Sequence, residues 1–392
     1  MTTYSGQINT YVNTVPDKRM VTDRILMIEP YNIATYLALG TDVAKFNMTN
    51  REGKKYEWLE DTFTPVTDLM ASNTMATNTT TSYSFTPTTL GFYQPGDILL
   101  IGAEKLWVSS VSSGVPTCVR GWGDSTHSTH ASGDTVTIIG RARIDGDAAD
   151  NSPYTEVASG YNYTQIMQRT IEVPRSKEKL AEYGISSWTD YQIDKNMKDL
   201  MMLLNKLPFY GTRSATTSLG GAGTAAVART AGGLRTFITD NITYATGTAA
   251  TGGTASALTR KHIDDTLQNI WTDGGSPDLI VTGAWAQRKL NDFYEGFIMQ
   301  SPDYNIGGNL ITKLRHPITG DLIDILVDRA CPTNELWILS REHISYYPFD
   351  PFFYEELAKT GDARLGEVVG EYGFICSYDK AHGLVAEFST SL

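Results

Sequence analysis

The stretch SSWTDYQIDKNMKDLMMLLNKLP, residues 186–208, carries the clearest helical pattern in this chain of 392 residues. Asp190 follows Ser187 by three positions, which is the signature of a helix start whose serine side chain accepts a backbone N–H. Proline lacks a backbone donor, so Pro208 predicts the end of the helix. Twenty helical residues form a rod of about 30 Å. One apolar stripe runs along it, made of Ile193, Met197, Leu200, Met201, Leu204 and Leu207.

Two further segments alternate apolar and polar side chains, as half-buried β-strands do. In KKYEWLEDTF, residues 54–63, Tyr56 and Trp58 share one face. We expect this segment to pair with YNYTQIMQRTIEV, residues 161–173, in a long antiparallel hairpin. Ten residues of strand reach about 33 Å, so the hairpin would project from a compact body and its aromatic face would need a cover from outside. The second segment has its own shared face of Met167, Arg169, Ile171 and Val173.

Between these two segments the chain contains several short apolar strands separated by turn residues. They are GDILLIG (96–102), EKLWVSSVSS (104–113), PTCVRGW (116–122) and DTVTIIG (134–140). Short strands at this spacing are typical of a small all-β module. The sequence therefore predicts such a module over residues 77–143, inserted into the hairpin.

The rest of the chain mixes helices and strands without a regular βαβ alternation, which indicates an α+β fold. A polar, aperiodic arm to about Thr22 precedes a short helix over residues 32–39 that ends at Gly40. TRKHIDDTLQNIWTDGG (259–275) predicts a helix whose apolar face is Ile263, Leu267, Ile270 and Trp271. PDLIVTG (277–283) predicts a buried strand, AWAQRKLNDFYEGF (284–297) a helix, and LIDILVD, ELWILS, GEYGFICSYD and GLVAEF four later strands.

Composition excludes several classes of protein. An apolar fraction of 41% and a charged fraction of 19% are those of a globular chain, and a net charge of −12 argues against a dedicated nucleic-acid grip. Cys118, Cys331 and Cys376 are widely spaced and odd in number, which favours reduced, buried thiols in a cytoplasmic setting. The N-terminus lacks the pattern of a secretory signal, and the apolar runs are shorter than the roughly 20 residues of a membrane span.

The pair His127 and His130 lies between Asp124 and Asp134 in RGWGDSTHSTHASGD, residues 120–134. Zinc would need a third or fourth ligand, and a catalytic zinc helix would need HExxH, whereas the spacer here is Ser-Thr in loop-like surroundings. A metal site and a simple turn between two strands both remain open, and we favour the turn.

Other candidate chemistry is weak. GAGTAA, Gly221–Ala226, matches a loose dinucleotide fingerprint but follows no buried strand, so we expect a loop. Glu57, Glu60 and Asp61 could act as acid and base on paper, but a solvated or ion-paired face is favoured. The chain shows no nucleophile elbow, Walker loop or cysteine–histidine signature. We therefore expect no catalytic, cofactor-binding or metal-binding residue.

Several motifs, taken in order, resemble the major capsid proteins of tailed bacteriophages, which have the Hong Kong 97-type fold. The most specific is FFYEELAKTGDARLGEVVGEYGFICSYDKAHGLV (352–385), and YEWLEDTF (56–63), YGISSWTDYQIDKNMKDL (183–200) and PDLIVTGAWAQRKLNDF (277–293) also match. The resemblance implies an N-terminal arm and short helix (1–45), an extended loop with outgoing (46–76) and return (144–180) limbs around the β module (77–143), a spine helix (181–212), an axial domain (213–337) and a β-rich segment completing the peripheral and axial domains (338–392).

The resemblance also bears on the histidine pair. Some members of this branch carry a β module with an RG-aromatic-G … H … G turn between its last strands, and Arg120, Gly121, Trp122, Gly123, His130 and Gly133 match that turn. His127 is then an incidental second histidine. Lys54 and Lys55 lie in the loop where a related shell family forms a Lys–Asn isopeptide bond. No partner Asn or acid can be matched, so cross-linking is not predicted.

The function that the resemblance implies is structural. The subunit would assemble with itself into hexamers and pentamers of an icosahedral shell around double-stranded DNA, without cofactors and without sequence-specific DNA binding or membrane contact. Scaffolding, portal and decoration proteins would be further partners. The protein would belong to the virion and assemble in the cytoplasm of the bacterial host. An encapsulin-like shell around a protein cargo is the alternative, and a secreted adhesin or tail fibre is disfavoured by the missing signal and the amphipathic helix.

Overall fold

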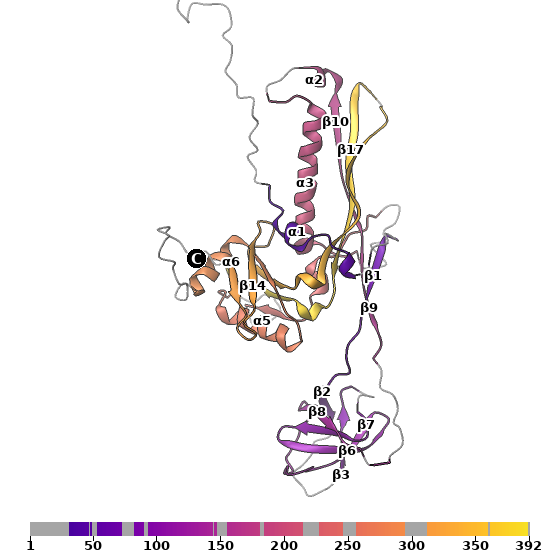
Figure 1. Cartoon of the computed structure of the whole chain (residues 1–392), viewed down its shortest axis with the longest axis vertical. Coiled ribbons are helices and arrows are strands. Elements are labelled where there is room, and N and C mark those ends of the chain that lie inside the picture. Colours follow the sequence, from indigo (N-terminus) through magenta and orange to yellow (C-terminus); the bar gives the residue numbers. More distant parts are fainter. Residues whose placement is uncertain are drawn as a thin grey trace, which may run out of the picture. The chain divides into compact units, whose positions relative to one another are not determined.

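The structure is a computed structural model that describes residues 31–46, 48, 53–72, 82–89, 93–143, 145–146, 155–180, 184–214, 227–245, 256–294, 312–359 and 361–390 (Figure 1). The chain forms two compact units. We call Met1–Trp58 with Gly160–Leu392 the main unit, and Leu59–Ser159 the β unit. The expected arm over residues 1–22 and the loop Gly221–Ala226 lie outside the described residues.

The main unit contains both helices and strands, so the predicted α+β class is confirmed. Its helices are α1 (Ala34–Leu39), α2 (Arg175–Lys179), α3 (Trp188–Tyr210), α4 (Leu234–Phe237), α5 (Arg260–Thr272) and α6 (Ala284–Tyr294), with single 3-10 turns η1 (Ala44–Phe46), η3 (Arg341–His343) and η4 (Asp379–Ala381). Among the described helices none combines the length and apolar composition that a membrane crossing needs.

Helix α3 is the predicted long helix. Its N-cap is Ser187, whose Oγ accepts the backbone N–H of Asp190 at 3.2 Å. The predicted stripe is confirmed, because Leu200, Leu204 and Leu207 are buried and Ile193, Met197 and Met201 pack partly buried against the same core. The helix does not end at Pro208 as predicted but continues to Tyr210, and Leu207, Pro208 and Phe209 of its last turn are buried.

Helix α3 lies along a three-stranded antiparallel sheet in the order β10–β17–β16 (Figure 1). The strands are β10 (Gln165–Pro174), β17 (Ala363–Cys376) and β16 (Ile344–Glu356), and β10 pairs with β17 from Gln165↔Tyr372 to Pro174↔Ala363. The expected long hairpin is therefore confirmed only over its first residues, where 158–163 pair with 55–60, and is wrong for residues 165–174. Residues 165–174 pair within the main unit because Met167, Ile171 and Val173 are buried in the core that α3 shares.

A short two-stranded ladder joins the segment that leads from the main unit into the β unit to the segment that leads back. It pairs β1 (Lys55–Glu60) with β9 (Ala158–Tyr163). Tyr56 and Trp58 are each only 6% exposed, so the expected uncovered aromatic face is also wrong. The Tyr56 hydroxyl donates to the carbonyl of Phe374 at 3.0 Å and accepts its N–H at 2.7 Å. The Trp58 ring lies 5.5 Å from that of Phe237, so this pair belongs to the core of its own subunit.

Changing Tyr56 and Trp58 together to Ser should therefore destabilise the isolated subunit. Emptying a buried aromatic site costs about 3–5 kcal/mol per residue, and the Phe374 backbone would lose its partner as well. Denaturant unfolding of dissociated subunits measures the effect, with exposed Glu57→Ser as the control. An unchanged unfolding midpoint in the double variant would show that the two rings do not stabilise their own subunit, as expected of an intersubunit contact.

A second, six-stranded sheet in the main unit is buried on both faces. Its order is β11–β18–β15–β12–β14–β13, and β11–β18 and β12–β14 are its parallel pairs. Alternate residues of β12 enter two cores, Val281 facing the α3 side and Ile280 the side of α5 and α6. Two buried faces explain the continuous apolar run LIVT. The strands are β11 (Ile242–Tyr244), β12 (Leu279–Thr282), β13 (Lys313–Arg315), β14 (Leu322–Val327), β15 (Glu335–Leu339) and β18 (Gly383–Ala386).

Helix α5 confirms most of its predicted face. Ile263, Leu267 and Ile270 are fully buried, and the helix packs against β18 and β11. Trp271, which was expected on the same face, is half exposed, and Thr266 is buried instead, with its hydroxyl bonded to that of Thr243 on β11. Trp271 follows Ile270 directly, and the rotation of 100° per residue of a helix carries the larger ring out of the core.

The β unit is a seven-stranded sheet that closes on itself. Its order is β3–β7–β6–β5–β8–β2–β4, and the two outermost strands are separated in sequence only by the fully buried Phe85. The chain therefore joins the two edges covalently, which removes most of the exposed edge. The strands are β2 (Thr67–Ser72), β3 (Ser82–Ser84), β4 (Thr86–Pro87), β5 (Asp97–Ile101), β6 (Glu104–Ser112), β7 (Val115–Val119) and β8 (Thr135–Arg141).

Strand β2 corrects the expected start of the module at residue 77. It pairs with β8 through Asp68↔Val136 and with β4 through Met70↔Pro87, and Met70 is 1% exposed in the module core. The unit needs this strand because without it the edges of β8 and β4 and part of the core would face water.

A fragment of residues 59–159 should consequently fold alone, whereas a fragment of residues 77–143 should not. The first keeps every strand of the closed sheet, and its size is within what folds independently. Amide NMR dispersion and a cooperative thermal melt test both. A well-dispersed spectrum from the shorter fragment would show that β2 is dispensable.

Candidate functional site

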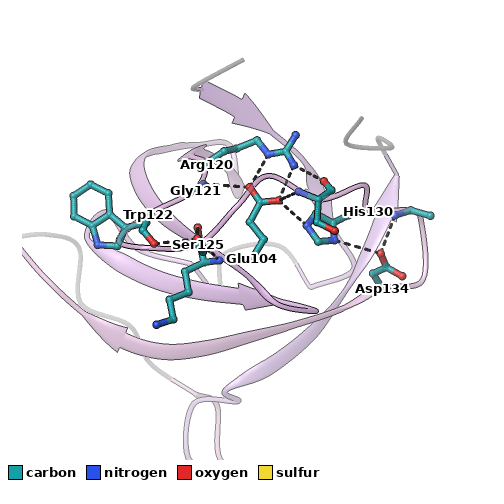
Figure 2. Close-up of polar contacts among 10 residues, drawn as sticks. Glu104, Arg120, Gly121, Trp122, Ser125, His130 and Asp134 are labelled. Carbon is teal, nitrogen blue, oxygen red and sulfur yellow. Dashed lines mark hydrogen bonds and ion pairs between the residues drawn. The ribbon is translucent and has the colours of Figure 1, made fainter. Parts of the chain in front are cut away.

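The most organised polar cluster of the described residues lies in the loop that the sequence singled out. Residues 120–134 connect β7 to β8, as predicted, and they gather around Glu104 at the start of β6 (Figure 2). Glu104 alternates in phase with Leu106 and Val108, so its side chain points into the module with theirs. The carboxylate is fully buried, and Arg120 and His130 are each 3% exposed.

Every lone pair of this buried carboxylate has a donor. Its Oε1 accepts from Arg120 Nε at 2.9 Å and from the Gly121 N–H at 3.2 Å. Its Oε2 accepts from Arg120 Nη2 at 2.6 Å and from the Ser128 N–H at 2.8 Å, and it bonds His130 Nε2 at 2.9 Å. The Arg120–Glu104 contact is the bidentate fork that guanidinium and carboxylate groups form best. Such a cluster offsets its desolvation through complete pairing.

The glycines of the loop make this packing possible. Gly121, Gly123 and Gly133 all have positive φ angles, which residues with a side chain rarely adopt. A Cβ on Gly121 would also lie 2.8 Å from the His127 ring, so this ring covers the turn. Trp122 stacks on Trp107 with ring centroids 5.1 Å apart. The matched residues of the RG-aromatic-G … H … G turn thus act together as one folded loop.

The electrostatics favour an ionised Glu104. Burial alone would raise its pKa, but the hydrogen bonds led by that from Arg120 outweigh this effect and lower the pKa to about 2. Asp134 approaches the other side of the His130 ring, with 3.7 Å between Nδ1 and Oδ2, and accepts the Ala131 N–H at 2.9 Å. Asp124 is exposed in the same loop.

The arrangement fits an ion-pair cluster that stabilises the loop better than it fits a metal centre. Both oxygens of Glu104 are engaged by Arg120, and a guanidinium at this position would repel a cation. Within the described ranges, no group of three or more His, Cys, Asp and Glu side chains is arranged to hold a metal ion. His127 and His130 are brought into one loop, and the bond of 2.9 Å from His130 Nε2 to Glu104 holds that histidine within the ionic cluster.

Sequence reasoning missed Glu104, the centre of the cluster. The signal was present, because in EKLWV the glutamate alternates in phase with Leu106 and Val108 on the buried face. A charged residue on the buried face of a strand requires an oppositely charged partner. Arg120, the charged residue of the matched turn, was the candidate for that partner.

The remaining singled-out residues lie apart from this cluster. Glu57 pairs with Lys55, whose ammonium also lies 4.4 Å from the centre of the Tyr161 ring. Asp61 is exposed and accepts the Thr155 hydroxyl at 3.2 Å. Lys54 contributes its backbone carbonyl to Thr164. The three cysteines are buried and unbridged, and burial raises the pKa of Cys118 to about 12.

The Glu104 cluster predicts a defined acid sensitivity of the β unit. The folded pKa of about 2 lies below the ordinary value of 4.5, so the contribution to stability is complete above pH 4.5 and is lost as the pH falls toward 2. The unfolding free energy of residues 59–159 should fall by roughly 3 kcal/mol across this range. Denaturant melts from pH 6 to 2.5 measure it.

Two variants test whether Glu104 causes this acid sensitivity. Glu104→Gln should show a shallower dependence on pH, whereas exposed Asp124→Asn should keep the wild-type profile. Equal slopes in all three proteins would place the acid sensitivity outside the cluster.

The subunit combines a long helix on a three-stranded sheet, a mixed sheet buried on both faces, and a β insertion stabilised by internal ion pairs. This architecture is that of a structural shell protein. The chain belongs to the SU10 major capsid protein family, whose model matches residues 2–389. It is therefore a bacteriophage major capsid protein of the Hong Kong 97-type fold, a virion component that assembles with itself into an icosahedral shell. The resemblance drawn from the sequence motifs is confirmed, and the family favours the capsid over the encapsulin-like alternative.

Several solved structures are similar to this chain. The capsid of a native GTA particle is 9% identical, with a TM-score of 0.49 over 97% of this chain and 97% of that chain. The capsid asymmetric unit of cyanophage A-1(L) is 14% identical, with a TM-score of 0.47 over 64% and 85%. The holo-SrpI encapsulin complex of Synechococcus elongatus is 8% identical, with a TM-score of 0.41 over 61% and 78%. No curated protein matches the chain significantly.

Proposed function

We propose that this subunit acts by assembly alone, without catalysis, and forms hexamers and pentamers of a closed head shell around double-stranded DNA. Assembly takes place in the cytoplasm of the bacterial host, with scaffolding, portal and decoration proteins as further partners. The proposal is carried by apolar surface that the isolated subunit leaves exposed on rigid elements.

The receiving surface is a groove between β10 and α3 in the main unit, of about 440 Å³. Along it Ile166 is 53% exposed, Leu203 44% and Tyr210 60%. These side chains stand on the long helix and the strand that form the most regular part of the subunit. Exposed apolar side chains clustered on a rigid surface are typical of a protein–protein interface.

The occupant that we propose is the segment of residues 59–66 from a neighbouring subunit. In this segment Leu59 is 75% exposed, Phe63 99% and Val66 60%. Asp61 lies within the segment and Lys206 lines the groove, so opposite charges would set the register of the contact. The sequence had assigned this role to Tyr56 and Trp58, but those rings are buried in their own chain, so the contact begins at Leu59.

The acidic balance of the chain supports a passive container. A net charge of −12 gives no general basic lining, so DNA would be held by confinement and by a few local contacts.

Phe63→Ser and Leu203→Ser should each reduce the yield of closed shells severalfold. Surface changes of this kind usually alter the unfolding free energy by less than about 0.5 kcal/mol, so melts of dissociated subunits should stay near wild type. Ile139→Ser, at a side chain that is 46% exposed on the β unit, is the matched control and should assemble normally. Particle counts by negative-stain microscopy provide the measurement.

Two results would contradict the proposal. Normal shells from both variants would show that the groove is not an assembly contact. Wild-type shells that copurify with a protein cargo instead of phage DNA would favour the encapsulin-like compartment.

A further inference from the structure

A second cavity of the main unit, of about 650 Å³, lies beyond the end of α3. Three separate pieces of chain line it. The end of α3 contributes Tyr210 and the residues beside it, and α4 contributes Arg235. The segment between β14 and β15 contributes Arg329 and Asn334, and β15 contributes its first residue, Glu335. The apolar groove described above shares Tyr210 with this cavity but holds neither arginine.

Arg329 differs from most arginines of the subunit. It is exposed and makes no side-chain hydrogen bond or ion pair within the part of the chain that the structure describes. Most other guanidinium groups are committed to carboxylates or carbonyls, as in Arg120–Glu104, Arg175–Asp362, Arg229–Glu371, Arg341–Asp324 and Arg364–Glu356. In a chain with a net charge of −12, an uncommitted guanidinium in a cavity is the exception.

Arg235 adds a second guanidinium to the same cavity. Its Nη2 lies 2.5 Å from Glu335 Oε1, yet its side chain is 49% exposed, so part of the fork stays open. Two guanidinium charges against one carboxylate leave the lining with a net charge of +1. Tyr210 adds a neutral donor to this charge, because a tyrosine hydroxyl is protonated at neutral pH. Burial, followed by the field of Glu335, raises its pKa further.

We propose that this cavity binds a phosphate group of the DNA that the shell encloses. Guanidinium forks match phosphate oxygens in geometry and charge, and tyrosine, threonine and asparagine side chains commonly complete such contacts without reading the base sequence. Arg329 contributes the principal charge, Arg235 the open part of its fork, and Tyr210 a hydroxyl donor. The inference rests on the proposed enclosure of DNA and names a local contact through which it is made.

The test uses the full-length subunit, dissociated from shells, and a fluorescently labelled duplex of random sequence. Binding is measured by anisotropy at several salt concentrations. Losing one phosphate contact should lower the slope of log affinity against log salt by about 0.9. Arg329→Gln should show this loss, and Arg329→Lys should recover most of the slope because it keeps the charge.

Arg288→Gln provides the matched control, since Arg288 on α6 is also exposed and removing it changes the net charge equally. It should keep the wild-type slope. Thermal melts of all variants should coincide, because the exposed Arg329 side chain makes no hydrogen bond or ion pair within the described residues.

Three outcomes would overturn the assignment. Equal salt slopes for Arg329→Gln and Arg288→Gln would show that the cavity does not bind a DNA phosphate. Calorimetric binding of inorganic phosphate that is lost in Arg329→Gln, with the DNA slope unchanged, would make it a site for a free anion. Failure of Arg329→Gln to form shells, again with an unchanged slope, would make it a contact with an acidic segment of a neighbour. Wild-type shells without DNA would instead refute the proposed enclosure while leaving the subunit measurement interpretable.

Discussion

The carbonyl of Phe374 on β17 is the point on which the rest of the subunit depends. It accepts both the Tyr56 hydroxyl at 3.0 Å and the Asn162 Nδ2 at 2.7 Å. The first donor comes from the strand that leads into the β unit and the second from the strand that leads out. Asn162 is fully buried, and its Oδ1 accepts the N–H of Gly232 at 2.9 Å. Because both ends of the insertion are fixed to one buried acceptor, the main unit can carry a complete second core without disturbing its own.

A second buried acceptor ties distant parts of the main unit together in the same way. Asp328, at the end of β14, is 1% exposed. Its Oδ2 accepts the backbone N–H of Thr35 on α1 at 2.9 Å and the Asn205 Nδ2 on α3 at 2.8 Å. Removing this carboxylate would leave buried donors unpaired, which costs more than the hydrogen bonds themselves contribute. The short helix α1 is thus held to both the long helix and the six-stranded sheet.

Periodicity and capping were enough to predict the elements whose signal is local. Ser187 and the apolar stripe predicted α3, and the residues around Ile263 predicted α5. Strand β16 was missed because Pro348 and Pro351 interrupt its pattern. An edge strand tolerates proline, since one side of it forms no ladder, and its pairing with β17 shifts register between Pro348 and Phe353. Pairing partners were the main error, because alternation shows that a strand has two faces without showing which strand lies beside it. Residues 165–174 therefore read equally well as a hairpin limb or as a neighbour of β17.

A sequence pattern also does not show whether an apolar side chain is buried within its own subunit or against a neighbouring one. Tyr56 and Phe63 are aromatic residues seven positions apart in one extended segment, yet the first is 6% exposed and the second 99%. Each would stabilise whatever covers it by a similar amount, because the free energy follows the apolar area removed from water. What differs is whether the cover is in the same chain, and a single sequence does not encode that distinction locally. The hydroxyl of Tyr56 bonds the backbone of Phe374 and so fixes this ring within its own subunit, whereas Phe63 carries no such group and stays exposed.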